Sequence, residues 1–137
     1  MFDEDDDYYE DGVNVRDLSL FKKGEEIREV VQILTELMPE DNEYLQSLKG
    51  EMLSDAAILT VKLAIAEAVE LYGLKMEAAT CIRKAANDLK VMNHSLEDFG
   101  FEYTEYFQIV RNLIEEYRIL FIDWVSKFDE WNYIIDC

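Results

Sequence analysis

The chain has 137 residues, of which 13 are Lys or Arg and 31 are Asp or Glu, so its formal net charge is −18. This length fits one domain, and a hydrophobic fraction of 50% excludes a wholly disordered acidic chain. Nucleic acids and anionic membranes are polyanions, so the charge argues against both as partners. One Pro and five Gly argue against a turn-rich β domain, and two Cys with one His argue against a disulfide scaffold or a structural zinc site.

Residues 1–15 are predicted to form a flexible acidic tail, because seven of the first eleven are Asp or Glu and like charges repel. Residues 16–137 are predicted to form the single folded domain. The acidic start is the reverse of a secretory signal, and no run approaches the roughly 20 apolar residues of a membrane span. We therefore expect a cytoplasmic protein in which Cys81 and Cys137 are reduced thiols.

Apolar residues recur at a 3.6-residue period along most of the domain. They predict a first helix over residues 24–38, which Pro39 ends by disfavouring the α conformation of the residue before it. A second helix should begin after a cap at Asp41 or Asn42 and continue to about Val69. Its middle is apolar nearly all round, so we expect a central helix that touches several neighbours.

The rest of the chain predicts two more helices. Gly73 should break the pattern in a tight hairpin, since Gly tolerates the positive φ of a helix end. A third helix is expected over 75–93, a connection over 95–101, and a fourth helix over 102–131. No segment alternates with a period of two, so no sheet is expected. The sequence therefore predicts an all-α fold, an antiparallel up-down four-helix bundle.

The last helix is rich in aromatic residues, whereas the second and third are rich in Ala. Large residues against small ones let layers of a bundle interdigitate. Trp124 is accordingly predicted to be buried at the seam of the bundle. The apolar run Trp131–Ile135 must be covered either by its own bundle or by a partner, and we expect a homodimer to bury it.

One set of carboxylates could hold magnesium. Glutamates three or four positions apart share a helix face, and two such helices could hold Mg²⁺ between them. The residues are Glu25, Glu26, Glu29, Glu67 and Glu70. Their spacing vaguely resembles the all-α nucleotide pyrophosphohydrolases, whose helices carry Glu-Glu-x-x-Glu and Glu-x-x-Asp, with Glu70 here in place of the Asp. That resemblance implies a magnesium-dependent hydrolase. A solvated acidic face explains the same residues.

Other chemical motifs fail. His94 alone cannot build a di-iron site, which needs two Glu-x-x-His motifs, and we expect it to sit at the C-terminal end of the third helix. A calcium loop starting at Asp3 would need Gly at its sixth position and Glu at its twelfth, where the chain has Tyr8 and Asn14. Phosphate-loop, dinucleotide and nucleophile-elbow motifs are absent from the sequence. The sequence thus predicts no catalytic residue, no cofactor and no metal site.

Several stretches together resemble an uncharacterised family of short, acidic, all-α bacterial proteins. The resemblance spans roughly residues 15–136 and is carried by the segments 39–45, 71–77, 82–86, 114–121 and 128–133. It implies an all-helical bundle and no assigned activity. The layout is also similar to small four-helix proteins encoded within ribosomal RNA intervening sequences. Related bundles are basic and associated with nucleic acid, a role that a charge of −18 disfavours.

These observations favour a non-enzymatic interaction or structural protein that associates with itself. Two alternatives remain open. One is the magnesium-dependent hydrolase built on the five glutamates. The other is an acidic nucleic-acid mimic that occupies a basic groove on another protein.

Overall fold

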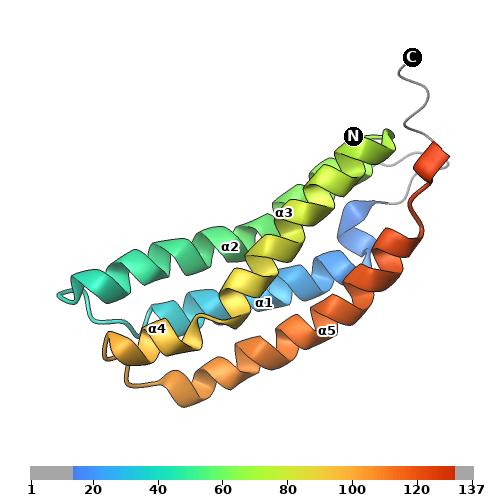
Figure 1. Ribbon diagram of the computed structural model, residues 1–137. Coiled ribbons are helices and arrows are strands. Elements are labelled where there is room, and N and C mark those ends of the chain that lie inside the picture. Colours follow the sequence, from blue (N-terminus) through green and yellow to red (C-terminus); the bar gives the residue numbers. More distant parts are fainter. Residues whose placement is uncertain (1–13, 132–137) are drawn as a thin grey trace, which may run out of the picture.

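The structure, a computed structural model, describes residues 14–131. Over that range the chain is all-helical and contains no strand, which confirms the all-α class. Figure 1 shows four long helices lying side by side, with the short helix α4 at one end. The long helices are α1 (Ser19–Thr35), α2 (Glu43–Ala68), α3 (Tyr72–Lys90) and α5 (Phe107–Ser126). The short elements are η1 (Val15–Asp17), α4 (Asn93–Asp98) and η2 (Thr104–Tyr106).

The first helix begins earlier than predicted. It starts at Ser19 rather than residue 24, and Gly24 is buried within it. A Cβ atom on Gly24 would stand 2.9 Å from Cγ2 of Thr60 and 3.3 Å from the carbonyl oxygen of Leu59. Gly is therefore needed for the close approach of α1 to α2, and it does not mark a helix boundary.

The predicted break between the second and third helices is present, but it does not lie at Gly73. The reversal lies at residues 69–71, and Gly73 is the second residue of α3. Among the described glycines only Gly100 has a positive φ, at 86°. The end of α2 does not need Gly, because the carbonyl of Ala66 accepts hydrogen bonds from Lys75 Nζ (2.7 Å) and from the amide of Val69 (3.4 Å).

The segment between α3 and α5 also differs from the prediction. The expected connection over 95–101 contains most of α4, which ends where Gly100 adopts its left-handed conformation. The amide of Phe101 then donates to the carbonyl of Leu96 at 2.9 Å, the return bond of a glycine-terminated helix. The last helix was predicted over 102–131, but η2 precedes it and α5 itself spans Phe107–Ser126.

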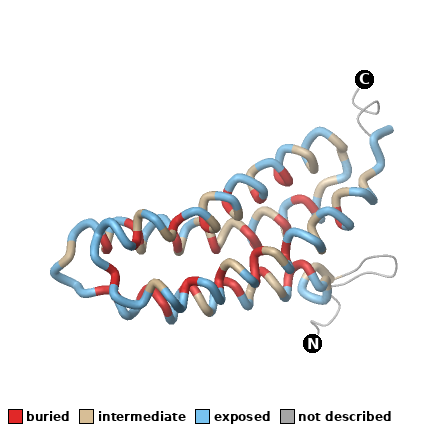
Figure 2. The backbone as a smooth tube through the Cα atoms, turned by 60° about the horizontal axis from the view of Figure 1, so that its bottom comes forward, coloured by how far each residue is buried: buried red, intermediate tan, exposed pale blue. Residues whose placement is uncertain are grey.

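The core lies between the four long helices, and Figure 2 shows buried positions along their facing sides. α2 packs against both α1 and α3, α1 packs against α5, and α3 touches α5 less extensively. Trp124 is 9% exposed, which confirms its predicted burial. Of the two predicted caps of α2, Asp41 and Asn42, the structure shows Asn42, whose side chain accepts from the amide of Leu45 at 3.1 Å.

Both predicted end segments fall largely outside the described residues. The acidic tail over 1–15 is described only at Asn14 and Val15, and Val15 begins η1 and packs against the core. The run Trp131–Ile135 is described only at Trp131, which is 71% exposed.

Candidate functional site

The five glutamates of the magnesium alternative lie on two helices and in the turn between α2 and α3. Glu25, Glu26 and Glu29 lie on α1 and Glu67 lies near the end of α2, whereas Glu70 lies in the turn after α2 and not on the helix. Glu26 accepts a hydrogen bond from Lys23 Nζ (2.9 Å). Within residues 14–131, no three His, Cys, Asp or Glu side chains lie close enough to share a metal ion. The structure therefore does not bring these glutamates together as a magnesium site.

The other chemically notable side chains stand apart. Cys81 is a free, half-buried thiol on α3. The predicted place of His94 is wrong, because α3 ends at Lys90 and His94 lies, exposed, in the first turn of α4. The α3 terminus falls earlier because the amide of Val91 closes the last turn onto the carbonyl of Asn87 (3.2 Å).

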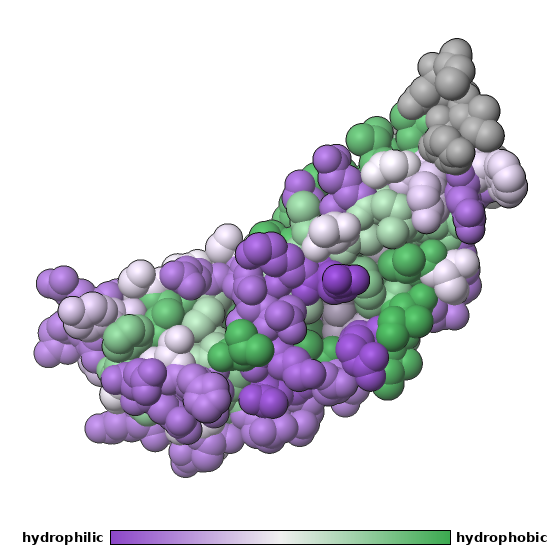
Figure 3. All heavy atoms as spheres, viewed as in Figure 1, coloured by the Kyte–Doolittle hydropathy of each residue, from purple (hydrophilic) through white to green (hydrophobic). Residues whose placement is uncertain are grey.

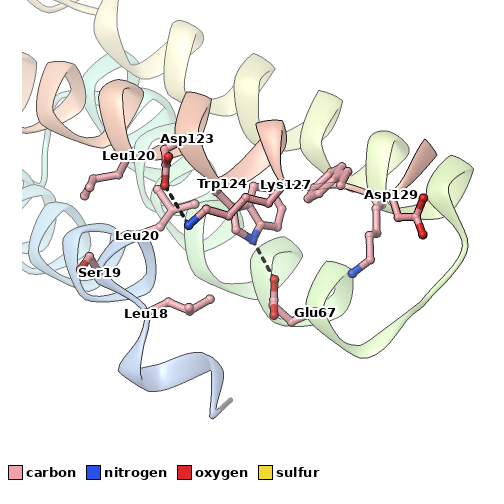
Figure 4. A pocket seen from close by; sticks show the side chains of 11 residues that line it. Leu18, Ser19, Leu20, Glu67, Leu120, Asp123, Trp124, Lys127 and Asp129 are labelled. Atoms are coloured by element: carbon pink, nitrogen blue, oxygen red, sulfur yellow. Dashed lines mark hydrogen bonds and ion pairs between the residues drawn. The ribbon is translucent and has the colours of Figure 1, made fainter. Parts of the chain in front are cut away.

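An open groove of about 490 Å³ lies where η1 and α1 meet the ends of α2, α3 and α5. Trp124 forms part of its lining, and its indole Nε1 donates to Glu67 Oε2 at 2.7 Å (Figure 4). Lys127 pairs with Asp123 at 3.2 Å, and Lys75 lies 5.7 Å from the centre of the Phe128 ring. The other lining residues are Leu18, Ser19, Leu20, Leu120 and Asp129.

Every charged side chain of this groove has a partner within the chain. In addition to the contacts above, Lys75 donates to the backbone of α2, and Asp129 Oδ1 accepts from the amide of Trp131 at 3.0 Å. These bonds tie the ends of three helices together. The groove is best explained by stabilisation of that end of the molecule rather than by chemistry.

A smaller groove of about 110 Å³ separates α3 from α5. Its floor includes Ile82, Ala86 and Phe121. Figure 3 shows apolar atoms gathered between these helices and hydrophilic atoms over the end that carries α4. At its rim, Glu115 binds both Lys90 (2.6 Å) and Arg118 (3.1 Å), and these hydrogen bonds lower the pKa of the Glu115 carboxyl.

The end of the molecule that carries α4 is strongly acidic and aromatic. The α1–α2 connection meets the α4–η2 segment there, since Asn42 Nδ2 donates to the carbonyl of Phe99 (3.0 Å) and the Phe99 ring stacks on Tyr44 at 4.9 Å. No Lys or Arg occurs in the stretches 29–48 and 91–110. The exposed carboxylates of this end are Glu36, Glu40, Asp41, Glu43, Glu97, Asp98, Glu102 and Glu105. We call this surface the acidic end.

From Ser54 to Ala68, about four turns at 3.6 residues per turn, the side of α2 that faces solvent carries no charge; the exposed Glu51 lies at the start of this side, beside Ser47, Gly50 and Ser54. Val61 is 55% exposed and Ile65 is 46% exposed on it. We call this surface the outer face of α2. It comprises Ser47, Gly50, Ser54, Ala57, Ile58, Val61, Ala64, Ile65 and Ala68. The sequence predicted a central helix that touches several neighbours; α2 packs against α1 and α3, but this remaining side faces solvent.

The border between α2 and α3 carries the charges that the outer face lacks. Asp55 is half-buried there, and desolvation together with the nearby Asp88 carboxylate raises its pKa to about 6. Lys84, which pairs with Asp88 at 2.8 Å, acts in the opposite direction and lowers the pKa of Asp55. The outer face is thus an uncharged strip beside an ionised edge.

Comparison with known proteins adds no relative. No protein-family profile, no curated protein and no solved structure matches this chain. Among the helices of residues 14–131, none is both long and apolar enough to cross a membrane. The function is therefore inferred from the surfaces of the molecule itself.

Proposed function

We propose that this chain is an antiparallel up-down four-helix bundle that works as a non-enzymatic interaction protein and associates with itself through the outer face of α2. The three-residue link over 69–71 supports the antiparallel arrangement of its two neighbouring helices. The free thiol of Cys81 supports a cytoplasmic location for the protein, because the cytoplasm is a reducing compartment.

One observation carries this proposal: α2 exposes the large aliphatic side chains of Val61 and Ile65 on a face that carries no charge from Ser54 to Ala68. Single exposed aliphatic residues are ordinary, but these two lie next to each other on one side of one helix, beside the half-buried Ile58. Removing such a strip from water is favourable in proportion to its apolar area. A packed partner supplies that burial.

The charge of the chain shapes how this association should behave. Two copies that carry −18 each repel one another, and dissolved salt screens that repulsion. The apolar side chains of the contact have no charges to screen, so salt acts mainly on this repulsion. Added salt should therefore strengthen the dimer, whereas it weakens an association that is driven by opposite charges.

Sedimentation of the full chain at low and moderate salt tests the proposal. We expect a monomer–dimer equilibrium that shifts toward the dimer with salt, and a monomeric Val61→Glu variant of unchanged helicity. Ile119→Glu is the matched control, because Ile119 is 63% exposed on α5 and lies away from this face. A full chain that stays monomeric at high concentration and moderate salt would overturn the proposal, and so would loss of the dimer in Ile119→Glu alone.

A second candidate, binding of a basic protein, is favoured by the acidic end. Its carboxylates stand beside Tyr103 and Tyr106, whose rings stack at 6.2 Å and are 38% and 49% exposed. Carboxylates pair with Arg, and aromatic faces attract its guanidinium. An arginine-rich peptide should then bind with an affinity that falls steeply with salt, and Tyr106→Ala should weaken it. Binding that does not respond to Tyr106→Ala would reflect net charge alone.

A further inference from the structure

We infer that two copies of this chain pair α2 against α2 in antiparallel orientation, around a two-fold axis that passes between Ala57 and Ile58. This inference rests on the proposed self-association and specifies its geometry. In a two-fold interface each residue contact occurs twice, so the surface must be complementary to itself. The outer face of α2 meets that condition when its small residues face its large ones.

Side-chain size changes along the outer face. Its first half carries the small residues Ser47, Gly50, Ser54 and Ala57, with the exposed Glu51 at their edge. The larger Ile58, Val61 and Ile65 follow in its second half. A large side chain packs well into the space above a small one, because interfaces are as closely packed as protein interiors. The outer face of α2 therefore has large side chains in its second half and space to receive them in its first half.

Antiparallel pairing about this axis brings the two halves together. Because the axis passes between residues 57 and 58, a residue of one copy faces the residue of the second copy whose number adds to its own to give 115. Ile58 then meets Ala57 of the second copy, Val61 meets its Ser54, and Ile65 meets its Gly50. A parallel pair would instead place Val61 on Val61 and Gly50 on Gly50, which crowds one end and leaves a gap at the other.

The charges beside the face agree with the same register. Lys62 lies level with position 53 of the second copy, between Glu51 and Asp55 on the same side of that helix. Lys62 forms no ion pair within residues 14–131. Lys62 therefore gains a carboxylate on pairing, and no two like charges of α2 are brought level.

Gly50 gives the register a steric test. A Cβ atom there would meet nothing within 4 Å in its own chain, and the same is true of Gly73 on α3. Leu at position 50 would occupy the space that Ile65 of the second copy needs. We expect Gly50→Leu to raise the dimer dissociation constant about tenfold or more. Gly73→Leu, the matched control, should leave it unchanged.

Disulfide cross-linking in a full-length Cys81→Ser, Cys137→Ser background tests the orientation. Ala57→Cys lies beside the axis and should form a disulfide-linked dimer on mild oxidation. Ser47→Cys alone and Ala68→Cys alone should not cross-link, because each thiol would lie about 31 Å from its copy, at 1.5 Å per residue over 21 positions. A mixture of these two variants should give the mixed dimer.

The outcomes separate this inference from the proposed function. Cross-linking of Ser47→Cys with itself would show a parallel pair and overturn the register, while self-association through α2 would stand. A dimer in sedimentation without any cross-link at Ala57→Cys would overturn the register and move the contact away from this face. A chain that sediments only as a monomer would overturn the proposed function itself.

Discussion

The inner face of α2 and the part of its outer face from Ser54 to Ala68 are both free of charge, yet only the inner face is buried. On the inner face, Leu45, Met52, Leu59 and Leu63 are fully buried against neighbouring helices. On the outer face, Val61 remains more than half exposed. An apolar helix face in the sequence therefore indicates that the face can pack against another surface. It does not indicate whether that surface belongs to the same chain or to a partner.

Specific complementary features distinguish the inner face. Gly24 on α1 leaves space for Thr60, and the buried Tyr117 hydroxyl on α5 donates to the carbonyl of Leu59 at 2.9 Å. Such features on other helices select which side of α2 turns inward. Five predictions test this distinction and the packing behind it; the first four concern stability and are given in decreasing order of expected effect.

The largest effect is expected where α5 closes over the inner side of the bundle. Trp124 packs on Phe128 at 4.7 Å between ring centres and on Phe121 at 5.9 Å, besides its bond to Glu67. Trp124→Ala should lower the free energy of unfolding by about 3–5 kcal/mol, measured by urea denaturation. Ile122→Ala, at a position that is 55% exposed on the same helix, should change it by less than about 0.5 kcal/mol. Equal effects would contradict the burial assignment.

Alanine at two glycines should act in opposite directions. Ala is the better helix former by about 1 kcal/mol, so Gly50→Ala on the outer face should raise the unfolding free energy by up to that amount. At Gly24 the new methyl group meets Thr60 and Leu59, and the resulting overpacking should outweigh this gain by about 1 kcal/mol. Thermal unfolding of both variants at low protein concentration measures the difference. A stabilised Gly24→Ala would show that α1 and α2 separate easily.

Loss of one buried hydroxyl should give a smaller effect. Tyr117 is 1% exposed, and burial raises the pKa of its phenol, so the hydroxyl is neutral at physiological pH. Tyr117→Phe removes its hydrogen bond to α2 and should cost about 0.5–1.5 kcal/mol of unfolding free energy. Urea denaturation measures this cost. The ring packing should survive, so an unfolded Tyr117→Phe protein would contradict this account.

The smallest effect depends on pH. Because the pKa of Asp55 is raised from 3.8 to about 6 in the fold, the folded state prefers its protonated form. The stability that this preference supplies is complete below pH 3.8 and is lost as the pH rises through about 6. The Asp55→Asn variant should therefore have the same melting temperature as the wild type near pH 4. At pH 7.5 its melting temperature should be higher than that of the wild type. Melting temperatures that differ equally at both values would contradict this expectation.

The Asp55 titration can also be followed directly. Lys84 lowers the pKa of Asp55, so Lys84→Met should move the titration midpoint of the Asp55 carboxyl upward, as read by nuclear magnetic resonance. An unmoved midpoint would mean that Lys84 lies farther from Asp55 than the structure places it.

The sequence predicted what local periodicity determines. Hydrophobic spacing gave the helical class, the four long helices, the Asn42 cap and the burial of Trp124. It failed where glycines act through tertiary packing. Gly24 and Gly73 were both interpreted as helix boundaries, although one serves a close helix contact and the other simply lies within α3.

The candidate site was less accessible from sequence. The apolar circumference of α2 was correctly noticed, but periodicity cannot tell which side a second helix will cover. The glutamate hypothesis assumed that Glu67 and Glu70 share a helix face, and the end of α2 at Ala68 separates them. Both questions depend on where helices end and how they pack, which neighbours far along the chain decide.

The short turn over residues 69–71 also has a consequence for the order of assembly. α2 and α3 make the most extensive helix pair and are adjacent in the chain, whereas α1 meets α5 only after the intervening residues 36–106 have been brought round. Contacts that are local in sequence form fastest, since little chain has to be closed. We therefore expect the α2–α3 pair to form first and to serve as the template on which the two terminal helices dock. During synthesis, the outer face of α2 would then be exposed to solvent well before α1 packs against α5.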